Sequence, residues 1–118
     1  MTDRDQALRE SLLKICPHCF ICGYSKKDAG GKLILDGAHI KDYADNPAND
    51  NVRNMILLCP NHHREYDMGV VDFDIKGVIH TLDSNDPVNN TKMYYFPEYV
   101  PLGTIDYHNK TKFHGTCV

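Results

Sequence analysis

Two short chelating motifs, far apart in the chain, constrain the fold more than any other feature. Cys19 and Cys22 are separated by two residues, and Cys59 and His62 have the same two-residue gap. A Cys-x-x-Cys pair combined with a Cys-x-x-His pair is a plausible tetrahedral ligand set for zinc. We therefore expect residues 19–22 to fold against residues 59–62 around a structural Zn²⁺ ion.

An alternative first pair is also present, because Cys16 and Cys19 have the same spacing. Gly23 directly follows Cys22, and a turn that directs two thiolates at one ion tends to need the open backbone of glycine at that point. We therefore prefer Cys19 and Cys22, which makes Cys16 a spare or core thiol. The competing interpretation is four reduced, metal-free side chains near the surface.

Composition favours metal over disulfides. The 118 residues predict a single domain, 1–118, with a small core that a zinc ion would help to stabilise. No apolar run approaches the roughly 20 residues of a membrane span, and the N-terminus is too charged for a signal peptide. We expect a cytoplasmic protein without membrane contact, in which the five cysteines stay reduced.

The net charge of −3 argues against a protein that coats DNA through non-specific electrostatics. It does not exclude an enzyme whose bound cations offset the local negative charge.

The apolar pattern predicts an α+β fold. The expected elements are a helix over residues 3–14, a strand that starts at Leu33 and ends near His39, a loop over 41–53, a strand over 54–59, a helix from Pro60, a hairpin over 69–82, a loop over 83–92 and a short helix within 103–113. In the hairpin Val71, Phe73 and Ile75 alternate, residues 76–77 form the turn, and His80 is a surface or packing residue. The last helix would be capped by Thr104.

Two adjacent histidines predict two separate sites. On a helix His62 and His63 point about 100° apart and cannot easily bind the same ion. One can complete the zinc knuckle while the other faces elsewhere. His63 and Asp67 are four residues apart, share one helix face and can bind one divalent cation.

These residues suit phosphodiester hydrolysis, which needs a base to activate the attacking water and a cation to hold the negatively charged phosphate. His39 can be the base, because imidazole titrates near working pH. His63 and Asp67 would supply only two ligands, so water and phosphate oxygens would complete the coordination of the cation. Such a site suits Mg²⁺. Asn54 can orient His39 or tie the loop between the two strands.

The order Cys-x-x-Cys-Gly, Ala-His-Ile, Asn-x-x-x-Leu-Cys and His-His-x-x-x-Asp-x-Gly resembles the HNH endonucleases, the ββα-metal nucleases. The motif core spans residues 19–69. The segments Tyr-Asp-Met-Gly-Val-Val and Phe-Pro-Glu-Tyr-Val-Pro-Leu resemble the branch found in restriction-type and modification-dependent enzymes, so the resemblance covers residues 19–115.

This resemblance implies a zinc-stapled ββα-metal core with an added N-terminal helix, β-hairpin and C-terminal closing segment. It implies a metal-dependent DNA endonuclease that uses Mg²⁺ or Mn²⁺. The implied roles are general base for His39, the middle asparagine for Asn54 and the last histidine, a metal ligand, for His63. Asp67 matches a second helix ligand, and the structural zinc positions match Cys19, Cys22, Cys59 and His62.

One position departs from the family pattern. Many members have Asp, Glu or His directly before the base histidine, where this chain has Ala38. Asp36 lies two residues earlier on the same strand face and could substitute as a ligand.

Two other functions compete with a nuclease. One is a zinc-stapled nucleic-acid-binding module that is weak in cleavage or has lost it, and the other is a cysteine hydrolase or redox protein that uses the thiols of residues 16–22. No reader element is visible, so a homodimer or larger complex would supply sequence recognition on DNA.

Overall fold

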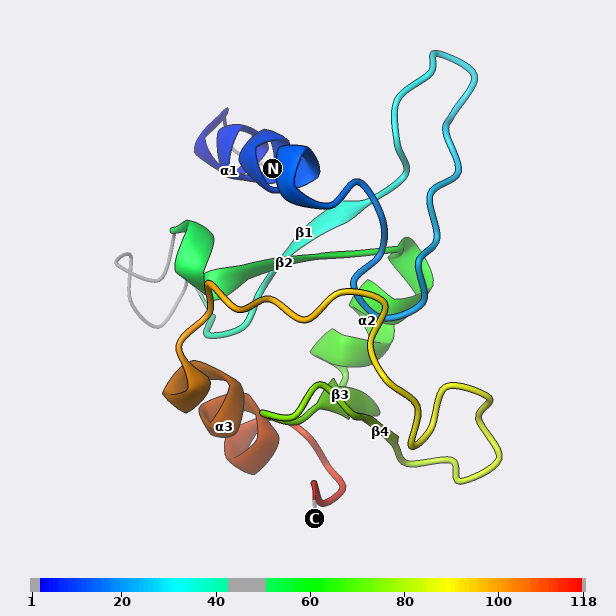
Figure 1. Ribbon diagram of the computed structural model, residues 1–118, viewed down its shortest axis with the longest axis vertical. Helices are drawn as coiled ribbons and strands as arrows, with labels where there is room; N and C mark the ends of the chain where they lie inside the picture. Colours follow the sequence, from blue (N-terminus) through cyan, green and yellow to red (C-terminus); the bar gives the residue numbers. More distant parts are fainter. Residues whose placement is uncertain (1–2, 43–50, 118) are drawn as a thin grey trace.

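A two-stranded hairpin lies between two helices in this computed structural model, which describes residues 3–42 and 51–117 (Figure 1). In chain order the elements are α1 (Asp3–Ile15), β1 (Asp36–His39), the 3₁₀ helix η2 (Val52–Asn54), β2 (Met55–Leu58), α2 (Pro60–Asp67), β3 (Val71–Phe73), β4 (Ile79–Thr81) and α3 (Leu102–Thr111). The predicted α+β class is confirmed. None of the helices in the described part of the chain is long and apolar enough to cross a bilayer.

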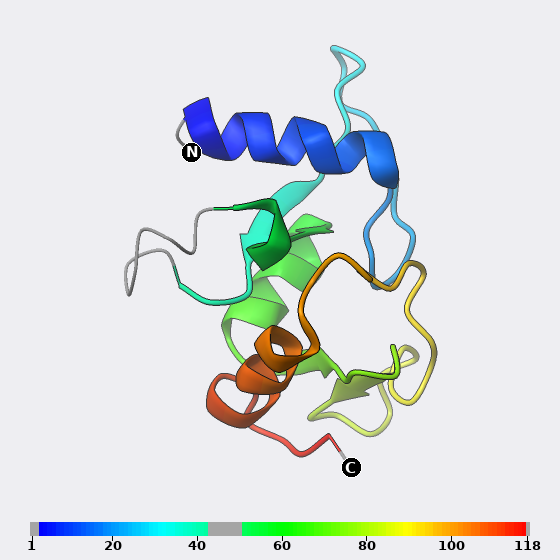
Figure 2. The same cartoon turned by 60° about the vertical axis from the view of Figure 1, so that its left-hand side comes forward.

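The central hairpin pairs β1 with β2 in antiparallel register, from Asp36 opposite Leu58 to His39 opposite Met55. Every residue of β2 is buried, because α1 packs on one side of the hairpin and α2 on the other (Figure 2). The apolar run that predicted this strand is thus explained by burial on both faces.

The second hairpin, β3 with β4, lies beyond the far end of α2, and α3 packs against β3 (Figure 1). Gly69 makes the turn from α2 into β3 with a φ of +73°. A Cβ atom at this position would collide with the carbonyl oxygen of Lys112 and the ring of His114. Glycine therefore allows the C-terminal segment to close tightly over the end of α2.

A buried carboxylate ties α3 to this second hairpin. Asp72 is fully buried, and its Oδ2 lies 2.8 Å from Nδ1 of His108 and 2.8 Å from Nδ2 of Asn109. A carboxylate only accepts, so both of these nitrogens donate. The ring of His108 stacks on Tyr66 of α2 with centroids 3.9 Å apart. The network joins β3, α3 and α2.

The first strand begins at Asp36, so the expectation that it begins at Leu33 is wrong. The backbone carbonyls of Leu33 and Leu35 accept hydrogen bonds from the guanidinium of Arg9 at 2.8 and 2.7 Å. Arg9 is 3% exposed. These carbonyls are therefore occupied by α1 rather than by a neighbouring strand.

The strand β3 is also shorter than the alternation predicted. Asp74 ends it, because its Oδ1 accepts from the backbone N–H groups of Lys76 and Val78 and forms the turn. Ile75 therefore lies in the turn and is 47% exposed. His80 is buried, and its Nε2 lies 2.8 Å from Asp74 Oδ2.

The last helix starts at Leu102, and Thr104 is not its cap. Pro101 occupies the N-cap position, and its carbonyl accepts from the N–H of Thr104 at 2.9 Å. In the predicted loop over 41–53, residues 43–50 lie outside the described residues, and η2 forms at its end.

We expect Asp72→Ala to reduce the free energy of unfolding by about 3–5 kcal/mol, because it leaves the buried Nδ1 donor of His108 without its acceptor and removes one of the two acceptors of Asn109 Nδ2. Urea denaturation measures the change. Asp106→Ala is the matched control, since its ion pair with Lys110 is exposed and should contribute less than about 1 kcal/mol. Equal losses in the two variants would contradict the structural role of the network.

Candidate metal centres and active site

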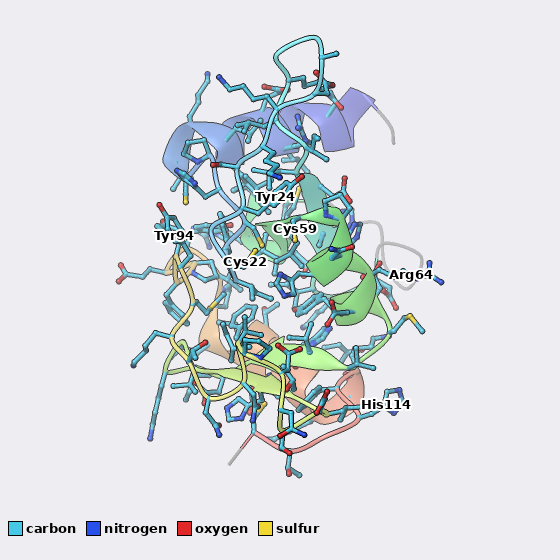
Figure 3. All side chains as sticks on the ribbon, turned by 90° about the vertical axis from the view of Figure 1, so that its right-hand side faces the viewer. Cys22, Tyr24, Cys59, Arg64, Tyr94 and His114 are labelled. Carbon is cyan, nitrogen blue, oxygen red and sulfur yellow. The ribbon has the colours of Figure 1, made fainter. Side chains whose placement is uncertain are left out.

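The side chains of the two chelating motifs lie together. Cys19 and Cys22 come from the turn after α1, Cys59 follows β2, and His62 lies in the first turn of α2. Their ligand atoms all lie within 4.8 Å of one another. Figure 3 shows the sulfur atoms of Cys22 and Cys59 close together between these segments. We call these four residues the Cys₃His cluster.

The distances in the Cys₃His cluster match a zinc-sized ion. The Sγ atoms of Cys22 and Cys59 are 3.9 Å apart, and Nδ1 of His62 lies 3.4 Å from Cys59 Sγ and 3.9 Å from Cys19 Sγ. Tetrahedral zinc, with Zn–S about 2.3 Å and Zn–N about 2.0–2.1 Å, requires S–S and S–N separations of roughly 3.8 and 3.6 Å. The donor set therefore fits such an ion.

The glycine after Cys22 has the backbone conformation that the sequence predicted. Gly23 has a φ of +79°, and its N–H donates to the carbonyl of Cys19 at 2.8 Å. A Cβ atom there would also collide with the ring of Tyr94. Both the turn and this close contact require glycine.

Without a cation, negative charge in the Cys₃His cluster concentrates on one thiol. Burial raises the pKa of Cys19, but hydrogen bonds from His62 and from the backbone outweigh it and lower this pKa to about 6. Burial raises the pKa of Cys22 to about 12, and the nearby charge of Cys19 adds to this rise. A bound cation would favour the thiolate form of all three cysteines.

The cysteines outside this cluster are Cys16 and Cys117. Cys16 is 7% exposed and belongs to the hydrophobic core. Burial raises its pKa. Among the described residues, the group able to hold a metal includes Cys22 and not Cys16. The geometry thus favours the pair Cys19 and Cys22 over Cys16 and Cys19.

The neighbouring histidine of α2 belongs to a second group. His63 Nε2 lies 3.2 Å from Asp67 Oδ2, one helical turn away, and His63 Nδ1 lies 2.9 Å from Asp36 Oδ2 on β1. We call Asp36, His63 and Asp67 the carboxylate–histidine group. As the sequence predicted, the two adjacent histidines face two different groups of side chains.

The two carboxylates hold a proton on His63. The hydrogen bond with Asp67 is the largest influence, and together with Asp36 it outweighs burial and raises the pKa of His63 to about 9. A cation that binds either ring nitrogen must displace this proton.

An open groove runs beside the carboxylate–histidine group. It has a volume of about 470 Å³ and is lined by Pro60, His63, Arg64, Asp67 and Met68. Figure 3 shows Arg64 on the outer side of α2, pointing into solvent. The group is thus accessible to a large ligand.

Asn54 fixes the chain just after β1. Its Nδ2 donates to the carbonyl of Lys41 at 2.8 Å, and its Oδ1 accepts from the N–H of the same residue at 2.8 Å. Its backbone carbonyl accepts from Ile40 at 2.9 Å. Of the two roles considered for Asn54, this geometry corresponds to tying the loop.

His39 and Asp36, the two candidate site residues on β1, lie at opposite ends of this strand. Half-buried His39 is the last residue of the strand, just before the segment 40–41 that Asn54 holds by hydrogen bonds, whereas Asp36 is the first residue and contacts His63. Ala38 is fully buried. Sequence reasoning considered Asp36 only as a substitute for a ligand at position 38. Alternation already places residues 36 and 38 on one face of the strand, but the contact of Asp36 with His63 of α2 involves a distant segment and has no local sequence signal.

Comparisons with known proteins agree with this architecture. The family described as HNH endonuclease matches residues 19–74, just under half of the chain. The fold is similar to that of the modification dependent TagI restriction endonuclease, with a TM-score of 0.67 and 23% sequence identity. The similarity covers 92% of this chain and 37% of that protein, so this chain spans little more than a third of its length. A search of curated protein sequences finds no match.

In metal-free protein we expect Asp67→Asn to lower the pKa of His63 more than Asp36→Asn does, because the Asp67 hydrogen bond contributes most. NMR titration of the His63 ring measures both shifts. Since the folded-state pKa is raised from about 6.5 to about 9, these pairs stabilise the fold fully below about pH 6.5 and progressively less up to pH 9. Asp42→Asn is the control. A His63 pKa that neither substitution at positions 36 and 67 lowers would contradict these pairs.

Proposed function

We propose that this chain is a metal-dependent endonuclease domain of the HNH type that hydrolyses DNA phosphodiester bonds. The observation that carries the proposal is the carboxylate–histidine group beside an open groove, within the segment that matches the family. The HNH match makes DNA the proposed substrate, and the fold similarity to a restriction endonuclease favours the same class.

The Cys₃His cluster would hold a structural Zn²⁺ ion. Its donors are three thiols and one imidazole, the set that zinc prefers in closed structural sites. The ion would attach the turn at residues 19–22 to the first turn of α2. This attachment sets the rotation of α2, and the rotation directs His63 away from the cluster and toward Asp36.

The carboxylate–histidine group would hold the catalytic Mg²⁺ or Mn²⁺. Carboxylate oxygens are the ligands that such hard cations prefer, and one ring nitrogen of His63 can join them. We propose Asp36 and Asp67 as the two carboxylates, so that Asp36 replaces the ligand lost at Ala38. When bound, the cation supplies charge stabilisation for the phosphate and the leaving oxygen.

His39 would accept a proton from the attacking water. An in-line displacement puts the entering water and the leaving oxygen on opposite sides of the phosphorus atom. We propose that His39 acts on the side of the entering water and that the cation group acts on the side of the leaving oxygen. Asn54 would keep the segment after His39 in place through its two hydrogen bonds to Lys41.

The second candidate is a zinc-stapled binding module without efficient cleavage. Ala38 and the net charge of −3 favour it. The assembled carboxylate–histidine group favours the nuclease, because a scaffold has no need for it. A cysteine hydrolase is disfavoured, since Cys19 and Cys22 lie in the cluster and zinc would occupy their thiolates. For the nuclease, a second copy of the chain or a larger complex would supply target recognition.

We expect the purified protein to nick or cut supercoiled plasmid in Mg²⁺ or Mn²⁺, and EDTA to stop the reaction. His39→Ala should reduce the rate by about 100-fold or more, because it removes the base, and leave the unfolding midpoint unchanged. Agarose electrophoresis of plasmid time courses measures the rate. The control is His114→Ala, which removes an exposed histidine beyond α3. Undiminished cleavage by His39→Ala would refute its role, and wild-type protein that binds DNA without cutting it would support the binding module.

We expect about one zinc ion per chain, lost in Cys59→Ser together with much of the thermal stability, because the ion joins two distant segments. Elemental analysis and thermal unfolding measure these effects. Cys16→Ser is a matched control, since Cys16 is also buried but lies outside the cluster. Folded wild-type protein without zinc, or equal loss of zinc in both variants, would disprove the assignment.

A further inference from the structure

We propose that a groove lined by Lys41, Arg53 and Thr104 binds a backbone phosphate of the DNA strand, next to the one that is cleaved. This inference rests on the nuclease function proposed above. The groove has a volume of about 230 Å³, and Asn51, Asn54 and Pro101 complete its lining. It lies where η2 and the start of α3 face the same side of the molecule (Figures 1 and 2).

The charge of this groove contrasts with that of the chain. The protein has more acidic than basic residues, with 16 Asp and Glu against 13 Lys and Arg. Among the residues that the structure describes, those lining the groove include no acidic residue, and the first turn of α3 carries none. Two cations without an acidic partner in this described lining favour the binding of an anion.

Both cations of the groove are available to an anion. The exposed guanidinium of Arg53 makes no ion pair or hydrogen bond within residues 3–42 and 51–117. The ammonium of Lys41 lies 4.9 Å from the ring centroid of Tyr107, a contact that holds it without neutralising its charge. Lys110 and Lys112, in contrast, pair with Asp106 and Asp42 at 2.8 and 2.7 Å.

The groove lies close enough to His39 to bind a phosphate that neighbours the cleaved one. Lys41 follows His39 by two residues, a distance of roughly 7 Å in extended chain. The two hydrogen bonds from Asn54 fix the backbone of Lys41, so its side chain starts from a defined point. A DNA strand whose scissile phosphate lies at His39 carries one further phosphate charge about every 3.4 Å along the axis of the DNA double helix. A neighbouring phosphate is therefore within reach of Lys41 and Arg53.

The donor chemistry indicates contact with the backbone rather than with bases. Arginine binds phosphate oxygens in a bidentate manner, lysine acts as a point charge, and a threonine hydroxyl can donate one hydrogen bond. Such contacts fix the position of a strand and carry no sequence information. We therefore expect the same contribution on DNA duplexes of different sequence.

The test is fluorescence anisotropy with a fluorescein-labelled 20-bp DNA duplex, without Mg²⁺ or Mn²⁺, at several salt concentrations. We expect Arg53→Gln and Lys41→Gln each to weaken binding and to reduce the slope of log Kd against log salt by about 0.9. The ratio of each variant's Kd to the wild-type Kd should therefore fall roughly 3.5-fold as the salt concentration rises from 50 to 200 mM. Arg53→Lys should keep the wild-type slope, because it keeps the charge.

The control is Lys27→Gln, which removes an exposed lysine from the loop between α1 and β1, outside the described lining of the groove. An unchanged slope in this variant supports the proposal. Equal reduction in all three glutamine variants, or no reduction at positions 41 and 53 in protein that cuts plasmid, would overturn the subsite and leave the nuclease function intact. Wild-type protein that neither binds nor cuts DNA would overturn both.

Discussion

The meeting of four donor atoms at one point is the constraint on which the site depends. Cys19 and Cys22 belong to a turn near the N-terminus, whereas Cys59 and His62 form the junction of β2 and α2. Bringing them within 4.8 Å fixes the start of α2 relative to the central hairpin. Because His63 follows His62, the rotation that satisfies one histidine determines where the other one points.

The far end of α2 has its own anchor, and it is polar. Tyr66 stacks on His108, and His108 pairs with fully buried Asp72. A buried carboxylate is costly unless all its neighbours donate to it, so this network has few alternative arrangements. The helix that carries His63 and Asp67 is therefore held at both ends, which favours one geometry between them.

The sequence predicted what depends on local pattern and not what depends on distant partners. Spacing identified the Cys₃His cluster and the two faces of α2, and apolar runs located both hairpins. The strand start at Asp36 was missed because Arg9, remote in sequence, occupies the carbonyls before it. The burial of Asp72 was missed for the same reason, since its donors lie on α3. Asp36 could be ranked only once α2 was seen to pack against β1, which places its carboxylate 2.9 Å from His63.

Charge distribution reconciles an acidic chain with the polyanionic substrate that we propose. Asp36 and Asp67 concentrate negative charge where a divalent cation would sit, and such a cation would change the sign of the local potential. At the other end of β1 fixed cations would serve the same purpose, since Lys41 and Arg53 line a groove whose described residues include no carboxylate. The net charge of −3 is therefore a weak argument against the proposed DNA binding. The arrangement of charge along one short strand is the relevant quantity, because exposed charges act over about one Debye length, near 8 Å at physiological salt.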